Sequence, residues 1–138
     1  MENLTDGSAE VLFEDSLENL HLQSEQWVEE VGLWKNELQF FQKILDRYSG
    51  CFNTTEQKKT LDHFQHIITY YSGQLLDDFK QRVRRHEKYL RGIMDGEEPN
   101  MESEFRARHS SLFELINSFR HEYNNYKQDL FHTMEGIM

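Results

Sequence analysis

A chain of 138 residues, 37% of them hydrophobic, is long enough to form one domain around its own core. The formal net charge of −10 disfavours attraction to nucleic acid or to an anionic membrane surface. Cys51 is the single cysteine, which excludes an intramolecular disulfide, and the sequence shows no signal-peptide pattern and no apolar run of about 18 residues. We therefore expect a cytoplasmic protein without a nucleic-acid or membrane partner.

The first 50 residues predict an acidic tail followed by a long helix. Residues 1–14 carry acidic side chains and no sustained apolar period, so we expect a flexible acidic N-terminal tail. Asp15 and Glu18 have the spacing of a capping box, and Gly50 is a natural C-cap. Between these signals an apolar stripe with steps of three and four predicts an amphipathic helix over 15–49. The stripe consists of Leu17, Leu20, Ser24, Trp27, Val31, Trp34, Leu38, Phe41, Leu45 and Tyr48.

The middle of the chain predicts a second helix, over 55–95, which a capping box of Thr54 and Gln57 opens. Its apolar stripe consists of Leu61, Phe64, Ile68, Tyr71, Leu75, Phe79, Val83, His86, Leu90 and Ile93. Three successive steps of four, from Tyr71 to Val83, break the heptad pattern. They indicate a stutter that locally straightens a coiled-coil-like supercoil.

The last part of the chain predicts a third helix, over 101–134, after a turn at Asp95-Gly96. Its stripe consists of Phe105, His109, Leu112, Ile116, Phe119, Tyr123, Tyr126 and Leu130. Three long helices joined by short turns predict an all-α fold, namely an elongated antiparallel up-down-up three-helix bundle of the coiled-coil type. We expect a single domain over 15–138.

A group of basic residues crowds the end of the second predicted helix. The group consists of Lys80, Arg82, Arg84, Arg85, Lys88 and Arg91. It is either a patch for anions or nucleic acid, or the partner of acidic residues in the first predicted helix. Those acidic residues are Glu18, Glu25, Glu29 and Glu30. We favour the intramolecular pairing, because antiparallel packing lays one group against the other.

A layer of histidine and glutamate is the strongest candidate site. If the chain folds back at its turns, His86 lies level with His109 and near His21, with Glu25 one turn from His21. Imidazole and carboxylate ligands on facing helices suit zinc, iron or another transition metal. Glu18 and His21 form a single Glu-x-x-His element, whereas a ferritin-like site needs two. The alternative is that His86 and His109 are half-buried residues whose hydrogen bonds are structural.

Two glycines fall at one level of the same register, Gly32 and Gly73. The aromatic residues that flank them are Trp34, Tyr70, Tyr71 and Tyr123. Facing glycines would let the helices approach closely, or they would leave an aromatic-lined pocket for a large ring. We favour close packing around the tryptophan over a pocket.

Several short patterns in the first two predicted helices resemble a known family. They are Leu20-His21 followed by Trp27, the run Glu37-Leu38-Gln39-Phe40-Phe41-Gln42-Lys43, and Asp62-His63-Phe64-Gln65. The chain resembles a family of small, uncharacterised bacterial all-helical proteins whose members carry a Leu-His-x5-Trp stretch, a Phe-Gln run and a His-Phe-Gln element. The resemblance covers most of the chain. It implies a helical fold and carries no reaction, cofactor or partner with it.

The sequence favours binding over catalysis. No histidine stands at motif spacing from Cys51, and no glycine-rich phosphate loop is present. We expect a non-catalytic protein-interaction or scaffolding module with no cofactor and with a protein partner or self-association as a homodimer. Apolar positions left over from the three stripes would pair two molecules, namely Leu33, Phe40, Phe113 and Leu115. The alternative is a metal-binding bundle for storage, sensing or redox chemistry, with His21, Glu25, His86 and His109 as ligands.

Overall fold

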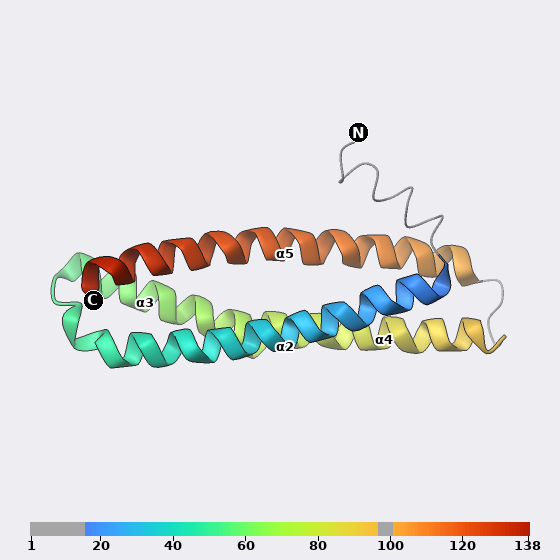
Figure 1. The fold of residues 1–138 in the computed structure, drawn as a ribbon, viewed down its shortest axis with the longest axis horizontal. Helices are drawn as coiled ribbons and strands as arrows, with labels where there is room; N and C mark the ends of the chain where they lie inside the picture. The colour runs from blue at the N-terminus through green and yellow to red at the C-terminus, as the bar shows by residue number, and fades with distance from the viewer. Residues whose placement is uncertain (1–15, 97–100) are drawn as a thin grey trace, which may run out of the picture. The chain divides into compact units, whose positions relative to one another are not determined.

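The computed structural model describes residues 16–96 and 101–138, and every regular element in these ranges is a helix (Figure 1). The first long helix is α2 (Leu17–Tyr48), followed by the short 3₁₀ helix η1 (Ser49–Cys51). α3 (Thr55–Tyr70), η2 (Tyr71–Leu75) and α4 (Leu76–Met94) then follow one another without a break, and α5 (Glu102–Ile137) completes the chain. The predicted all-α class is confirmed. None of the described helices is long and apolar enough to cross a membrane.

Local side-chain caps explain where two of the helices begin. The predicted box at Thr54 is confirmed, because the Gln57 backbone N–H donates to Thr54 Oγ1 at 3.1 Å and Gln57 Oε1 accepts from the Thr54 N–H. At α2, Ser16 Oγ accepts from the Asn19 backbone N–H at 3.2 Å. The predicted cap Asp15 and the predicted tail over 1–14 lie outside the described residues.

The two predicted glycine caps have different outcomes. Gly96 has a φ of 79°, the left-handed region that favours glycine, and its N–H donates to the Ile93 carbonyl at 3.1 Å. The end of the central helix at this position is therefore confirmed. Gly50 lies inside η1 and has no positive φ, so the prediction of a glycine C-cap there is wrong. The 3₁₀ turn closes the end of α2 instead.

The predicted irregularity of the central stripe takes the form of a π turn. The Leu76 backbone N–H donates to the carbonyl of Tyr71, five residues earlier, whereas an α-helix would use a residue four earlier. The buried stripe consequently steps from Tyr71 to Leu76, which is 1% exposed. Leu75, which the sequence places in the stripe, is only half-buried. That assignment is wrong, because the extra residue turns Leu75 off the core face.

The described residues divide into two compact units, each built from separated stretches of the chain. The first unit holds residues 16–29, 80–96 and 101–118. The second unit holds Glu30–Phe79 and Phe119–Met138. A single domain over 15–138 stays a prediction.

In the first unit, α5 pairs with α2 in the same chain direction and with α4 in the opposite direction. The contacts that establish this are Gln23 with His109, Trp27 with Phe113, His86 with His109 and Tyr89 with Phe105. Leu20, Leu90, Ile93 and Phe105 form an apolar cluster in this unit. Phe113, predicted as a leftover position for pairing two molecules, packs against that cluster.

In the second unit, α5 again pairs with α2 in the same direction and runs opposite to α3 and η2. The contacts are Trp34 with Phe119, Phe41 with Phe131, Phe64 with Tyr126 and Tyr71 with Tyr123. Aromatic rings therefore pack against one another in this core, which agrees with the favoured packing around Trp34. Gly32 and Gly73 take no part in it. A Cβ at either position would meet no atom within 4 Å, so the expected close approach of facing glycines is wrong.

Candidate functional site

The two buried histidines of the first unit form a hydrogen-bonded chain with Gln23. His86 on α4 is 5% exposed and His109 on α5 is fully buried. His86 Nε2 lies 2.9 Å from His109 Nδ1, and His109 Nε2 lies 2.7 Å from Gln23 Oε1 on α2. The predicted level of His86 with His109 is confirmed. The sequence offers no signal for Gln23, because a glutamine beside a helical stripe is unremarkable by itself.

Aromatic rings enclose this chain on both sides. The Trp27 ring stacks on His109 with centroids 4.7 Å apart, and the Phe105 ring stacks on His86 at 4.1 Å. These neighbours remove water from both imidazoles without offering a counter-charge. Burial lowers the pKa of His86 to about 4, with a further contribution from the positive charge of Arg108. Burial lowers the pKa of His109 to about 3. Both rings are therefore neutral at pH 7.

Neutral rings fix the direction of the hydrogen bonds. Gln23 Oε1 can only accept, so His109 Nε2 carries the proton and donates it. His109 Nδ1 then accepts from His86 Nε2–H. His86 Nδ1 is left as a buried acceptor, and no described residue donates a hydrogen bond to it. An unpaired buried polar atom costs free energy, so the folded state carries this cost at His86.

The other two predicted site residues lie in a separate pair. His21 Nε2 is 3.5 Å from Glu25 Oε1, and His21 Nδ1 is 2.9 Å from Glu87 Oε2 on α4. The four predicted ligands thus form two pairs and not one layer. Across the described ranges, no group of three or more His, Cys, Asp or Glu residues is arranged to hold a metal ion. Glu87 is a neighbour that sequence reasoning missed, because it flanks the buried stripe by one residue.

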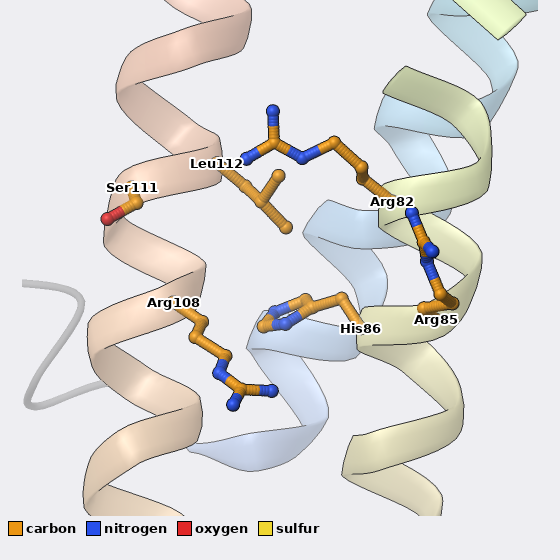
Figure 2. A pocket seen from close by; sticks show the side chains of 6 residues that line it. All are labelled: Arg82, Arg85, His86, Arg108, Ser111 and Leu112. Atoms are coloured by element: carbon orange, nitrogen blue, oxygen red, sulfur yellow. The ribbon is translucent and has the colours of Figure 1, made fainter. Parts of the chain in front are cut away.

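A pocket of about 310 Å³ lies beside the histidine chain, between α4 and α5 (Figure 2). Its lining consists of Arg82, Arg85, His86, Arg108, Ser111 and Leu112. Among the described residues, three guanidinium groups and no carboxylate line it. Arg108 also contacts Glu104 at 2.9 Å and lies over the Tyr89 ring at 4.7 Å, which holds this guanidinium on α5 near the pocket.

The basic group of α4 does not pair as the sequence predicts. Glu30 binds Arg120 on α5 at 2.6 Å, and Glu25 contacts His21. None of the six basic residues over 80–91 makes an ion pair with a described acidic residue. The predicted pairing with α2 is wrong for the described residues, because Glu25 and Glu30 take other partners.

Tyrosine hydroxyls supply the polar contacts of the second unit. Tyr123 Oη donates to Glu37 Oε1 and Tyr126 Oη donates to the Phe64 carbonyl, both at 2.9 Å. Burial raises the pKa of both hydroxyls well above 10, so they are protonated donors at pH 7. Tyr126 Oη satisfies a backbone carbonyl of the core, and Tyr123 Oη satisfies a half-buried carboxylate.

The fold places this chain in the all-helical class. Comparisons with models of known protein families, with curated proteins and with solved structures gave no match to the chain.

Proposed function

We propose that this chain is a non-catalytic protein-interaction module that self-associates through an exposed apolar patch of its second unit. The association patch consists of Leu33 and Phe40 on α2 and Phe131 on α5. Their exposed fractions are 57%, 59% and 49%. This exposure is the observation that carries the proposal, because covering large apolar side chains is favourable by about 25 cal/mol per Å².

Phe40 on α2 and Phe131 on α5 flank one buried ring of the second unit. This ring belongs to Phe41, which is 4% exposed. The Phe41 ring centroid is 6.3 Å from that of Phe40 and 5.6 Å from that of Phe131. A partner that covers Phe40 would therefore reach Phe131 as well.

Charges around the association patch favour a second copy of the chain as the partner. Lys43 and Arg47 are exposed and follow Phe40 by three and seven residues, on the same side of α2. Glu135 is exposed and follows Phe131 by four residues on α5. A two-fold axis would place the basic edge of one copy against the acidic edge of the other. We accordingly propose a homodimer.

The same proposal includes the up-down-up arrangement of the helices. It is supported inside each unit, where α5 runs with α2 and against the central helix. Such an arrangement leaves the outer faces of α2 and α5 free for a partner.

Analytical ultracentrifugation over a range of concentrations tests the homodimer. We expect concentration-dependent association of the wild-type chain and a monomer when Leu33→Ser is combined with Phe40→Ser. Leu22→Ser is a matched control, because Leu22 lies on the same helix and is 55% exposed. A wild-type chain that stays monomeric, or a control that weakens association equally, would refute the proposal.

The metal-binding alternative has less support. His86 and His109 direct ring nitrogens at each other, and the guanidinium groups of Arg82, Arg85 and Arg108 repel a cation at His86. A melting curve with added zinc, with added iron and with a chelator tests it. A shift of several degrees on adding metal, reversed by the chelator, would favour the alternative over the interaction module.

A further inference from the structure

We propose that the pocket between α4 and α5 of the first unit binds a small ligand through a phosphate-type oxyanion, with Arg82, Arg85 and Arg108 as the charged contacts. This goes beyond the interaction module, because it assigns a ligand class to residues that take no part in the association patch.

The positive charge of the pocket lining is the first observation that favours an anion. Arg82 extends from α4 toward α5 and Arg108 extends from α5 toward α4, whereas Arg85 runs along α4 at the edge of the same space (Figure 2). Neither Arg82 nor Arg85 makes an ion pair with any described residue. Arg108 has Glu104 as its described counter-charge and the other two guanidinium groups have none, so a multiply charged anion in the pocket would be stabilised.

The second step is the unpaired atom of His86. This side chain is 5% exposed, lines the pocket, and reaches from α4 into the space between Arg82 and Arg108 (Figure 2). Its Nδ1 is buried, and no described group satisfies it. This unpaired atom is on a side chain that lines the pocket, and it is an observation separate from the charges of the three arginines.

An anion at this place requires a donor, and the histidine chain can provide one without a net change of protonation. If His86 carries its proton on Nδ1, its Nε2 accepts from His109 Nδ1–H. His109 Nε2 then accepts from the amide of Gln23 after the amide turns over. Each ring keeps one proton, and only the positions of the protons change. His86 would then donate to the ligand.

The size of the pocket limits the ligand. Its volume of about 310 Å³ is at the low end of small-molecule sites. A water molecule takes roughly 30 Å³ of liquid, so a phosphate or pyrophosphate group fits with little apolar substituent. Leu112 is the one apolar residue among the described residues of the lining.

Isothermal titration of the full chain with sodium pyrophosphate, repeated with sodium phosphate, tests the proposal. We expect saturable one-to-one binding that Arg85→Gln weakens by roughly tenfold, the typical effect of losing one charge-assisted contact. Arg84→Gln is the matched control, because it removes the same charge from the adjacent exposed position, which does not line the pocket.

A second readout follows the imidazole of His86. In nitrogen-15 NMR we expect pyrophosphate to change the shifts of the ring nitrogens of His86 and His109 and to leave those of the exposed His66 unchanged. Absence of saturable binding, or an equal loss in Arg84→Gln and Arg85→Gln, would overturn the proposal and leave a non-specific basic surface. Binding without any change at the His86 ring would also overturn it.

Discussion

His86 Nε2 and His109 Nδ1 lie 2.9 Å apart in the interior of the first unit, and neither ring has an acidic partner among the described residues. Two imidazoles in this setting are stable only in the neutral form. The folded state is therefore sensitive to acid, and the sign of the effect follows from the two lowered pKa values.

We expect stability to fall between pH 7 and pH 5.5. The histidine pKa is 6.5 when unperturbed, and folding lowers it to about 4 at His86 and about 3 at His109. Below pH 6.5 the unfolded chain takes up two protons that the folded chain does not bind. The free energy of unfolding should drop by about 2.5 kcal/mol at pH 5.5 relative to pH 7. Urea unfolding at both pH values measures this drop.

The control for this prediction replaces both rings with glutamine, as His86→Gln with His109→Gln. This variant should be less stable at pH 7 but should lose far less stability on acidification. An equal loss in the variant would assign the acid sensitivity to groups other than these two. Arg108 and Arg106, the cations that add to the two shifts, are present in both proteins.

The π turn makes opposite predictions for two adjacent leucines. Leu76 is 1% exposed, so Leu76→Ala should leave a cavity and cost about 2–4 kcal/mol of stability. Leu75 is half-buried, and Leu75→Ala should cost about 1 kcal/mol. Chemical unfolding of the two variants measures the difference. The reverse order would mean that the helix continues without the extra residue.

Two glycines should respond to alanine with opposite signs. Gly32 lies inside α2, and an added methyl group there would meet open space, so Gly32→Ala should raise the free energy of unfolding by about 0.5–1 kcal/mol. Gly96 has a φ of 79°, and Gly96→Ala should lower the free energy of unfolding by about 1 kcal/mol. Thermal melting of both variants and of the wild-type chain measures these two changes in stability. Destabilisation by Gly32→Ala would indicate a contact at that face.

The hydroxyl of Tyr126 should contribute measurably to stability. It donates to the Phe64 carbonyl in the core, so Tyr126→Phe should cost about 1 kcal/mol while keeping the ring packing. Tyr70 is 44% exposed and its hydroxyl has no hydrogen bond to a described residue, which makes Tyr70→Phe the matched control. We expect that control to unfold within about 0.3 kcal/mol of the wild-type chain. Equal effects in the two variants would contradict the role of the buried hydroxyl.

Much of the helical framework could be predicted from the sequence. A helix that is buried on one face has apolar residues every three or four positions, and this spacing can be read directly from the chain. The central stripe shows the limit of this method. Leu75 and Leu76 are both leucine, so a step of four to Leu75 and a step of five to Leu76 look equally apolar. Packing of the neighbouring helices around Tyr71 decides which leucine is buried. The spacing of apolar residues within one helix carries no information about that packing.

The sequence predicts the positions of candidate-site residues that belong to the apolar stripe of a helix. It does not predict the contacts of residues that flank such a stripe. His86 and His109 face each other as their register predicts. His21 and Glu25 lie on the flank of α2, where one step of rotation directs a side chain away from the histidine chain. Arg108 was missed for the same reason. The partners of charged residues at a flank depend on the neighbouring helix and not on their own spacing.

The π turn at Tyr71–Leu75 also changes what the central helix can tolerate. The turn absorbs one extra residue, which in a continuous α-helix would rotate everything after it by about 100° about the helix axis. Phe64 and Ile68 before the turn, and Leu76 and Phe79 after it, belong to two helical lattices of different angular phase. A single-residue deletion inside the π turn would merge the two lattices into one continuous α-helix and keep both sets on the core face, because the step from Tyr71 to Leu76 would become a step of four. The same deletion inside α3 or α4 would instead rotate the residues on one side of it away from the core.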